Sequence, residues 1–437
     1  DLSFYDYFKA NVEEIKELKK GIGKLLMNAK RIGDFAILYS ASSVHLSTLT
    51  EGFPPMEQVL NSLVSLLEDL RCPFRIISYK QLEEGILGKE KFRFLLLPYA
   101  QALSPKEIQK IKDFVKNGGI VISDLRPGIY DQHGKPYEKC PLEEIFGAEL
   151  TANPQVKRGR ISLNLGANFP SSLPETFADA SIKLTTGKQY GEMEGTPCLI
   201  ANAYGKGKAF LLNLSLSPYS SQGESAQLWL SFFKSLLNYA GYIERVSLVP
   251  DVSGLRTYWF QQGANLYLGV LQELPEPSIN YALGKAKPVS AMPVKFTLPQ
   301  KYHIYDVRAG KYLGYGNLIN TKVELGRAKL YALLPYKINK LSLNIPSKAI
   351  QGGELTYELK MEGKSSSLGL HIVHLSLISP EGKTVDYYED NLVVKGGKIK
   401  GSVPLALNEE PGKWEVRVRD VATGISIEKT FVLEGIK

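Results

Sequence analysis

Cysteine and histidine are scarce in this sequence, which limits the chemistry that it can support. The three cysteines, Cys72, Cys140 and Cys198, are far apart and include no Cys-x-x-Cys pair, so neither a zinc site nor a disulfide framework is indicated. A single Cys140–Cys198 bridge stays open. Five histidines in 437 residues supply few general bases. We therefore expect no metal and no cofactor.

Long apolar runs and dense basic clusters are also missing. No apolar run approaches the roughly 18 residues that span a bilayer, so no membrane span is expected. The formal charge of +8 is modest for this length, and no arginine-rich run with interleaved aromatics marks a nucleic-acid groove. The chain opens Asp-Leu-Ser-Phe-Tyr, without Met or a signal-peptide pattern, and we expect a processed or truncated product. The compartment stays open, with an extracellular or periplasmic location favoured.

What is present is an alternation of short apolar strands and amphipathic helices between Phe35 and Gly128. This pattern predicts a parallel sheet covered by helices on both faces. Ligands of such sheets lie beyond the carboxyl ends of the strands, here the segments 39–45, 98–100 and 123–126. The predicted strands are 35–40, 74–79, 92–99 and 119–124, and the predicted helices are 55–70 and 105–117.

The flanking segments extend this domain. Val12–Arg31 has an apolar stripe at helical spacing; a basic amphipathic helix can lie on a membrane, but the short link to the first strand favours docking against the sheet. A turn-rich excursion, 126–136, follows the last parallel strand. We then expect a helix at 141–146, strands at 160–165, 198–204 and 208–214, a hairpin turn at 205–207, and a closing helix at 222–240 with Leu228, Phe232, Leu236 and Tyr239 on one face.

Beyond Gly241 the period changes from helical to alternating. Short strands separated by turn residues predict an antiparallel β-sandwich and then, after a linker around Asn344-Ile-Pro-Ser, an immunoglobulin-like sandwich. The strands expected in the first are 257–260, 265–271, 294–298, 303–308, 321–325 and 329–335. Those expected in the second are 354–361, 369–378, 383–388, 398–403, 414–418 and 425–433.

Several phrases resemble, in order, the region that follows the catalytic barrel in β-galactosidases of glycoside hydrolase family 42. They are Gly21-Ile-Gly-Lys-Leu-Leu, Phe35-Ala-Ile-Leu-Tyr-Ser-Ala-Ser-Ser-Val-His45, Leu95-Leu-Leu-Pro-Tyr-Ala-Gln-Ala-Leu-Ser104, Phe114-Val-Lys-Asn-Gly-Gly-Ile-Val-Ile-Ser123 and Tyr204-Gly-Lys-Gly-Lys-Ala-Phe-Leu-Leu-Asn213. The resemblance covers roughly residues 20–245 and implies a trimerisation domain with a flavodoxin-like fold, similar to class I glutamine amidotransferases. It also implies that the partner is a second copy of the chain or a glycoside-hydrolase barrel.

The sequence departs from these families at the residues needed for catalysis. The barrel with its acid/base and nucleophile glutamates would precede Asp1 and is absent from this chain. An amidotransferase needs a cysteine on a strand-to-helix elbow, activated by a histidine and an acid. Here the last parallel strand ends Ser123-Asp124-Leu125-Arg126, and Cys72 stands at the start of a strand. Amidotransferase activity is therefore not expected.

A Ser–His–Asp site at the carboxyl edge of the sheet is the sharpest enzymatic hypothesis. Its members would be Ser43, His45 and Asp124, with Ser42 and His133 nearby. No Gly-x-Ser-x-Gly elbow supports it, and Ser or His in such loops more often caps a helix or lines a domain contact. The chain is therefore interpreted as non-catalytic.

Paired carboxylates are the signature of glycoside hydrolysis. They occur as Glu192 and Glu194 and as the cluster Asp386, Glu389 and Asp390. The first pair lies in a Gly-rich loop, and the second lacks the motif of a Ca²⁺-binding loop. Both are interpreted as surface acidity.

Aromatic residues gather in the first of the two β domains, where a flat row of them can stack on sugar rings. The candidates for polysaccharide binding are Tyr258, Trp259, Tyr267 and Tyr305. Alternation along a strand predicts that about half of the aromatics point into the core. Tyr258 and Phe260 should share one face and Trp259 the other.

These interpretations combine into an amidotransferase-like α/β domain (1–245), a β-sandwich domain (246–345) and an immunoglobulin-like β-sandwich domain (346–437). The favoured function is a non-catalytic assembly or support region of a glycoside-hydrolase-like protein. The alternative is a free-standing carbohydrate-binding or cell-surface structural protein, and a hydrolase using the Ser43/His45/Asp124 edge is third. The expected oligomer interface consists of apolar residues in the loops 39–49 and 126–136, namely Val44, Leu46, Leu49, Ile129 and Tyr130.

Overall fold

The computed structural model describes residues 6–49, 52–220, 223–252, 254–273, 291–365 and 368–436. The chain forms two compact units: unit 1 comprises Asp1–Arg31 and Val246–Lys437, and unit 2 comprises Ile32–Arg245. Residues 1–31, expected with the α/β domain, thus belong to the unit that contains the β-rich half of the chain. Among the described residues, no helix is long and apolar enough to cross a membrane.

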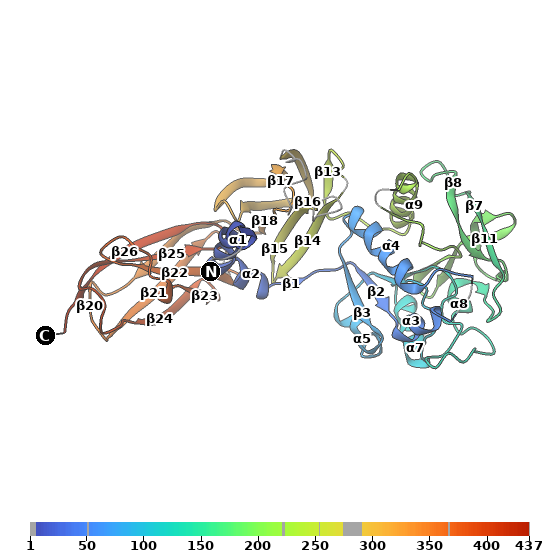
Figure 1. Ribbon diagram of the computed structural model, residues 1–437, viewed down its shortest axis with the longest axis horizontal. Coiled ribbons are helices and arrows are strands. Elements are labelled where there is room, and N and C mark those ends of the chain that lie inside the picture. Colours follow the sequence, from blue (N-terminus) through green and yellow to red (C-terminus); the bar gives the residue numbers. More distant parts are fainter. Residues whose placement is uncertain are drawn as a thin grey trace. The chain divides into compact units, whose positions relative to one another are not determined.

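Unit 2 is built on a nine-stranded mixed sheet (Figure 1). In spatial order its strands are β3 (Phe74–Ser78), β2 (Phe35–Tyr39), β4 (Phe94–Leu97), β5 (Ile120–Ser123), β12 (Gly207–Leu212), β11 (Thr196–Tyr204), β10 (Lys188–Met193), β7 (Val156–Leu163) and β8 (Ser172–Asp179). The first five are parallel, as the alternation of strands and helices predicts for β2 to β5. The last four continue the sheet in antiparallel order, and β6 (Ala148–Glu149) pairs separately with β9 (Lys183–Leu184).

Alternation along the parallel strands explains why helices cover both faces, as Figure 1 shows. Phe35 and Ile37 of β2 lie in one core, whereas Ala36 and Leu38 lie in the other. The first core is closed by α4 (Met56–Asp69) and α9 (Ala226–Tyr239), and the second by α5 (Tyr79–Glu83), α6 (Ile86–Lys89), α7 (Pro105–Lys116) and α8 (Glu143–Phe146). The expected helices 55–70, 105–117 and 141–146 are thereby confirmed as α4, α7 and α8.

Local capping explains where α7 begins. The Ser104 hydroxyl accepts a hydrogen bond from the Glu107 amide at 3.1 Å, and the Glu107 carboxylate accepts one from the Ser104 amide at 2.7 Å. This capping box satisfies amides that the first helical turn leaves without partners, and Pro105 has no amide hydrogen to lose.

Four expectations for unit 2 need correction. The segment after β2, expected as a loop, forms α3 (Ala41–Ser47) because Ser40 caps it by accepting a hydrogen bond from the Ser43 amide. Strands β8 and β10 were not expected, and β10 includes Glu192 of the supposed Gly-rich loop. The closing helix is described from Ala226, and Gln222 lies outside the described residues. Its buried face contains Trp229, Phe232, Phe233, Leu236 and Leu237, whereas Leu228 and Tyr239 are exposed.

Unit 1 contains a seven-stranded antiparallel sheet. In spatial order the strands are β1 (Lys30–Arg31), β14 (Leu255–Gln262), β15 (Asn265–Gln272), β18 (Lys329–Leu334), β16 (Met292–Asp306) and β13 (Ser247–Val249), and β17 (Lys311–Val323) also pairs with β16. The two strands expected at 294–298 and 303–308 are one long strand, β16. Its partner β17 continues it as a hairpin.

Two further sheets complete unit 1. One comprises β19 (Ile338–Asn344), β21 (Glu354–Gly363) and β24 (Lys398–Pro404). The other comprises β20 (Lys348–Ile350), β26 (Ser426–Glu434), β25 (Gly412–Asp420), β22 (His371–Ile378) and β23 (Asp390–Val394). Both contribute to one core, with Leu359 from the first sheet and Trp414 from the second.

Two expectations fail in this region. Residues 338–344 precede the expected linker but pair with β21, so they belong to the C-terminal sheets. Residues 383–388 do not form a regular strand; the short helix η2 (Asp386–Tyr388) lies there instead.

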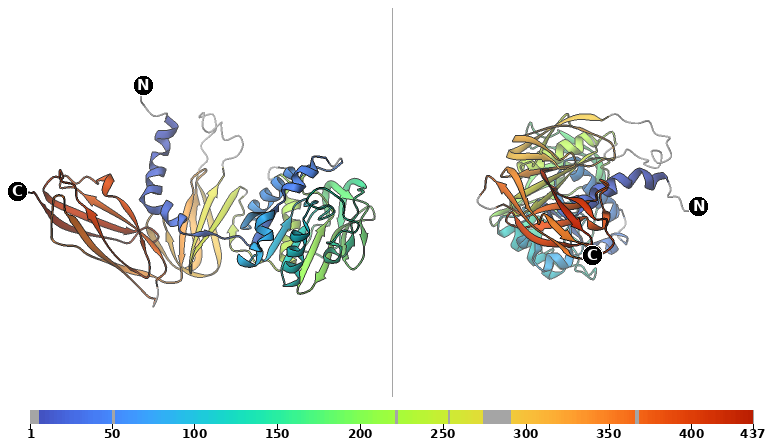
Figure 2. Two further views of the ribbon diagram at one scale, coloured as in Figure 1. Left: turned by 90° about the horizontal axis from the view of Figure 1, so that it is seen from below. Right: turned by 90° about the vertical axis from the view of Figure 1, so that its left-hand side faces the viewer.

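The N-terminal segment is a bent helix in unit 1, seen in dark blue beside the orange and red strands in Figure 2. It consists of α1 (Asp6–Glu17), η1 (Leu18–Ile22) and α2 (Gly23–Met27). The bend occurs at Gly21. Its φ of 113° is a backbone conformation that glycine adopts readily and other residues rarely do, and a Cβ at this position would clash with Val421. Ile22 and Leu25 then enter the core of unit 1. The expected docking of this helix on the parallel sheet was wrong.

Candidate functional site

Two residues at the carboxyl edge of the parallel strands have left-handed backbone conformations, which side chains other than glycine rarely adopt. Tyr99, with φ of 41°, follows β4, and Arg126, with φ of 59°, follows β5. Both side chains are buried. Such conformations cost about 1–3 kcal/mol each and collect at functional sites, so this edge is the first candidate for a site in unit 2.

Asp124 is a buried carboxyl group at the same edge. Its Oδ1 accepts a hydrogen bond from the Tyr99 amide, and its Oδ2 has no partner in the part of the chain that the structure describes. The carboxyl group lines a cavity of about 10 Å³ together with apolar side chains such as Ile122 and Phe233. Burial raises the pKa of Asp124 well above its ordinary value, although the Tyr99 amide opposes that shift. The burial thus favours the neutral form of this carboxyl group over the charged form.

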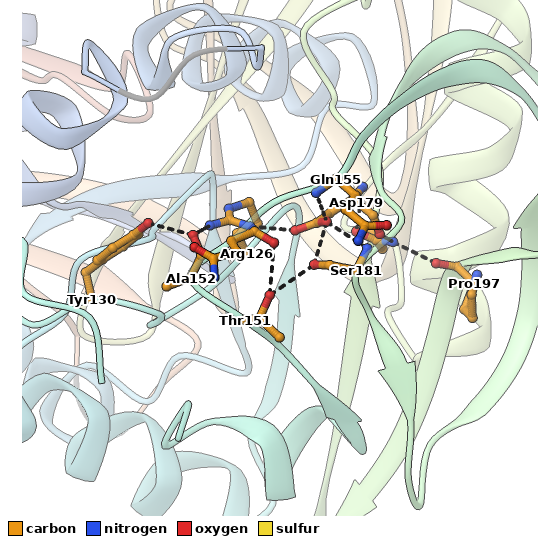
Figure 3. Close-up of polar contacts among 10 residues, drawn as sticks. Arg126, Tyr130, Thr151, Ala152, Gln155, Asp179, Ser181 and Pro197 are labelled. Atoms are coloured by element: carbon orange, nitrogen blue, oxygen red, sulfur yellow. Dashed lines mark hydrogen bonds and ion pairs between the residues drawn. The ribbon is translucent and has the colours of Figure 1, made fainter. Parts of the chain in front are cut away.

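Arg126, two residues after Asp124 in the sequence, forms a buried ion pair with Asp179 (Figure 3). The Arg126 Nη1 lies 2.5 Å from the Asp179 Oδ2. The Asp179 Oδ1 accepts hydrogen bonds from the Gln155 amide at 3.0 Å, the Ser181 amide at 2.9 Å and the Ser181 hydroxyl at 2.7 Å. The aspartate is therefore fully engaged and cannot serve as a base without losing four contacts.

The same network joins distant parts of unit 2. The carbonyl oxygen of Ala152 accepts hydrogen bonds from Arg126 Nη2 at 3.1 Å and from the Tyr130 hydroxyl at 3.0 Å. The Asn213 amide group donates to the carbonyl oxygens of Asp179 and Pro197, each at 2.8 Å. The network thus fastens the loop after β5 to the end of β8 and to the start of β11. Its evident role is to hold the parallel and antiparallel parts of the sheet together.

Ser43, His45 and Asp124 do not form a Ser–His–Asp site in the structure. Ser43 is buried, and its hydroxyl donates to the Ala102 carbonyl oxygen at 3.1 Å and accepts from the Ala102 amide at 2.9 Å. His45 is exposed on α3, whereas Asp124 is buried against Tyr99. Within the described residues, no hydrogen bond joins any two of these three.

The two neighbouring candidates have structural roles or lie at the surface. Ser42 is half-buried, next to Ser43 on α3. His133 is exposed in a turn, where its amide donates to the Asp131 carboxylate at 2.8 Å and its ring contacts Gln132 at 3.1 Å. Neither side chain has a hydrogen bond to Ser43 or Asp124 in the part of the chain covered by the structure.

The carboxylate candidates are paired with nearby polar groups. Gln189 donates to Glu192 at 3.0 Å, and Lys157 lies 3.2 Å from Glu194. In the second cluster Glu389 lies 3.5 Å from His374. No group of three or more His, Cys, Asp or Glu residues suited to a metal ion occurs in the described ranges.

The cysteines are free and buried, so the open question of a Cys140–Cys198 bridge is answered against it. Burial raises the pKa of Cys140 and of Cys198 to about 12, and it also raises the pKa of Cys72. A raised pKa and burial both lower the fraction of reactive thiolate at neutral pH. None therefore has the partly exposed, low-pKa environment of a catalytic nucleophile.

Three of the four sugar-stacking candidates belong to the core. Trp259, Tyr267 and Tyr305 are at most 3% exposed, because strand alternation turns them inward. Tyr258 is half-buried on the other face of β14, with the Arg31 guanidinium 5.5 Å from its ring centroid. The four residues therefore do not form a platform.

The five predicted interface residues also differ in how far they are exposed. Ile129 is buried in the core of unit 2, and Tyr130 is half-buried with its hydroxyl bonded to Ala152. Val44 and Leu46 are half-buried, and Leu49 is 78% exposed. Only Leu49 is prominent at the surface.

Known proteins resemble this chain over part of its length. Residues 88–227 match the β-galactosidase trimerisation domain. The resemblance stated from the sequence is thereby confirmed for this segment. β-Galactosidase LacA of Lactobacillus acidophilus is 24% identical over 222 residues, which are 48% of this chain and 32% of that protein.

Solved β-galactosidases share the fold. The enzyme from Bacillus circulans sp. alkalophilus superposes with a TM-score of 0.59 at 15% identity, covering 75% of this chain and 45% of its own. The cold-adapted enzyme from Rahnella sp. R3 gives a TM-score of 0.51 at 14% identity, covering 69% and 41%. The chain spans less than half the length of each of these relatives.

Sequence reasoning missed the Arg126–Asp179 network. The two residues are 53 positions apart, and neither stands in a recognisable motif. An arginine after a strand carries no signal that its backbone is left-handed or that its charge is buried. Only the packing of β8 against the rest of the sheet brings the partner into reach.

Proposed function

We propose that this chain is a non-catalytic assembly and support region of a glycoside-hydrolase-like protein, with unit 2 as the self-associating part. The match of residues 88–227 to the trimerisation domain carries the proposal. The carboxyl edge of the sheet supports it, since Ser43, Asp124 and Asp179 all make contacts within the chain. The catalytic partner would be a glycoside-hydrolase barrel.

We further propose a flavodoxin-like core for unit 2, similar to that of class I glutamine amidotransferases. The order β3-β2-β4-β5-β12 of the parallel strands supports this, because it is the 2-1-3-4-5 order of flavodoxin-like sheets. For the C-terminal sheets we propose an immunoglobulin-like sandwich, supported by the core that the three-stranded and five-stranded sheets share. The β-sandwich predicted for residues 246–345 has less support, because that region contains one seven-stranded sheet and a sandwich needs two facing sheets.

The assembly surface is proposed around Leu49. A Cβ added at Gly134 would lie 3.7 Å from Leu46 Cδ1, so the segment 39–49, which contains α3, adjoins the loop 126–136 as the interface hypothesis requires. Leu49 is 78% exposed at the end of the first segment. An apolar side chain displayed to this extent, next to half-buried Val44 and Leu46, suits a contact between copies of the chain.

Light scattering on the purified chain tests this proposal. At tens of micromolar the parent chain should have an oligomer mass, and Leu49→Asp should reduce it to the monomer, because an interface that buries about 1,200 Å² or more does not tolerate an unpaired charge at its centre. Ile243→Asp is the control, since Ile243 is an apolar residue of unit 2 that is 74% exposed. A monomeric parent chain contradicts self-assembly, and equal effects of the two variants contradict the placement of the interface.

Activity measurements test the non-catalytic part. The chain should hydrolyse neither nitrophenyl galactosides nor glutamine. Turnover that is abolished by Ser43→Ala or His45→Ala would overturn the proposal in favour of the hydrolase hypothesis.

A second candidate is a free-standing carbohydrate-binding or cell-surface structural protein. It is favoured by one observation, a partly exposed row of aromatic rings in unit 1. The genomic sequence upstream of Asp1 separates the two. A barrel encoded in frame favours the assembly function, whereas a signal peptide alone favours the second candidate.

A further inference from the structure

Four aromatic rings form a row along the β16–β17 hairpin of unit 1. His303 is opposite Tyr315 in the strand pair, with ring centroids 4.8 Å apart. The His303 ring is also stacked with Tyr312, at 5.9 Å and an interplanar angle of 29°. Tyr312 in turn lies 4.9 Å from Tyr305. The order Tyr315, His303, Tyr312, Tyr305 therefore describes one continuous row.

A break in the strand register places these rings on one face. Ile304 pairs with Gly314, but the next residue, Tyr305, pairs with Tyr312, so Leu313 has no opposite residue. In a regular strand, Tyr312 and Tyr315 would point to opposite faces, because they are three positions apart. The extra residue restores them to the same face, which is a known effect of a β-bulge.

The row runs from the core to the solvent. Tyr305 is 1% exposed and belongs to the core of unit 1, Tyr312 packs against that core, and Tyr315 is 62% exposed. A hydrogen bond of 2.8 Å between His303 Nδ1 and the Tyr312 hydroxyl fixes the middle of the row. The exposed end is thus an aromatic surface in which the Tyr315 ring is tilted by 41° from the His303 ring. Its fixed base lowers the entropic cost of binding a ligand there.

Two lysines, Lys337 and Lys364, lie near the row. The Lys337 Nζ lies 4.8 Å from the centroid of the Tyr312 ring, in a cation–π contact. The Lys364 amide donates to the Lys337 carbonyl oxygen at 3.1 Å, which keeps the two lysines adjacent. Burial, Lys337 and Lys364 together lower the pKa of His303, which favours the neutral form of the ring.

We propose that this row is a binding site for an acidic saccharide. A sugar ring would stack on the exposed Tyr315 ring beside His303, and its carboxylate or sulfate group would pair with Lys337 and Lys364. A neutral sugar would offer the two lysines hydroxyl oxygens but no negative charge. A single-stranded nucleic acid would need successive exposed rings along a basic groove, whereas Tyr315 is the one strongly exposed ring of this row.

Titration calorimetry on the full chain tests the site, with tetragalacturonate as the acidic probe and β-1,4-galactotetraose as the neutral probe. The acidic probe should bind at least about tenfold more tightly than the neutral one. Tyr315→Ala should weaken that binding about tenfold or more, whereas Tyr315→Phe should keep it within about threefold, since the ring face is retained. Lys337→Met should weaken binding of the acidic probe but leave the neutral probe unchanged.

Tyr387→Ala is the matched control, because Tyr387 is a tyrosine of unit 1 that is 72% exposed and donates to Glu409 rather than facing lysines. It should leave binding unchanged. No binding of tetragalacturonate at millimolar concentration overturns the proposal. So does binding that Tyr315→Ala does not reduce, which would reflect charge attraction alone. Equal affinity for the neutral probe, or tighter binding of an oligothymidylate through the same residues, also overturns it.

Discussion

The guanidinium of Arg126 and the carboxylate of Asp179 meet at 2.5 Å in the interior of unit 2, with side-chain exposures of 0% and 3%. Arg158 and Glu175 meet at the same distance on the surface, with exposures of 65% and 54%. The two ion pairs therefore have the same separation but differ in how far their side chains are buried. Removal of one partner of a buried pair leaves an uncompensated charge, whereas an exposed charge is solvated by water.

We predict that Asp179→Ala lowers the unfolding free energy of unit 2 by about 3–5 kcal/mol. Glu175→Ala should cost less than about 1 kcal/mol. Urea unfolding of both variants and of the parent chain measures the difference. Similar costs for the two substitutions would contradict a stabilising role for the buried network.

The Asp124 carboxyl group should make stability depend on pH. Its pKa is raised in the folded chain by burial. Between the unfolded and the folded pKa, the folded state therefore holds a proton that the unfolded state has released. Stability from this group is full below the unfolded pKa of about 3.9 and is lost as pH rises toward the folded pKa. Asp124→Asn removes this dependence, so it should gain stability over the parent chain by up to about 1.4 kcal/mol per pH unit above pH 4.

Asp131 supplies a control of the opposite sign for that experiment. Hydrogen bonds from the Lys135 and His133 amides lower the pKa of Asp131. Its contribution is therefore present above the unfolded pKa and is lost as pH falls. Unfolding measurements should show Asp124→Asn gaining stability over the parent chain as pH rises from 4 to 8, whereas the difference between Asp131→Asn and the parent chain should stay constant in that range and shrink as pH falls below about 4.

Gly21 should be the residue of the N-terminal segment that is least tolerant of substitution. A Cβ at this position would lie 2.4 Å from Val421 Cγ2, at a φ of 113°. We predict that Gly21→Ala destabilises unit 1 by about 1–3 kcal/mol. Adding Val421→Ala should relieve part of the cost by removing the clash.

Gly23→Ala is the matched control for that bend. Gly23 lies two residues further along with an ordinary helical φ of −57°. A Cβ there would lie 3.2 Å from the Leu18 carbonyl oxygen, compared with 2.4 Å from Val421 at Gly21, so alanine at Gly23 should change stability by about 1 kcal/mol or less. Thermal unfolding of all four chains provides the measurement. A Gly21→Ala variant as stable as Gly23→Ala would show that the close approach to Val421 is not needed.

The thiols offer a test of the cores of unit 2. All three cysteines are free and buried, and burial raises the pKa of Cys140 and Cys198 to about 12. A thiol reagent at pH 8 should therefore label none of them in the folded chain and all three after unfolding in guanidinium. Rapid labelling of one cysteine in the folded chain would contradict its placement.

The local sequence determined much of the α/β architecture. The β2 strand and the α4 and α7 helices were predicted to within a few residues, because apolar periodicity acts over a single element. The resemblance of the segment to the trimerisation domain was readable for the same reason, as it rests on short contiguous phrases. Alternation along β14 also placed Trp259 on the face opposite to Tyr258.

Tertiary structure alone decided the functional details. Nothing local to residues 12–31 shows that Ile22 and Leu25 enter the core formed by the distant C-terminal strands. Nothing near Ser43 in the sequence reveals that its hydroxyl forms hydrogen bonds with the backbone of Ala102, 59 residues away. The register break that aligns Tyr312 with Tyr315 depends on how two strands pair, and burial of Tyr305 depends on what packs over it. Periodicity records the environment of one element averaged over its length, whereas partners, burial and register are set by contacts between elements far apart in the chain.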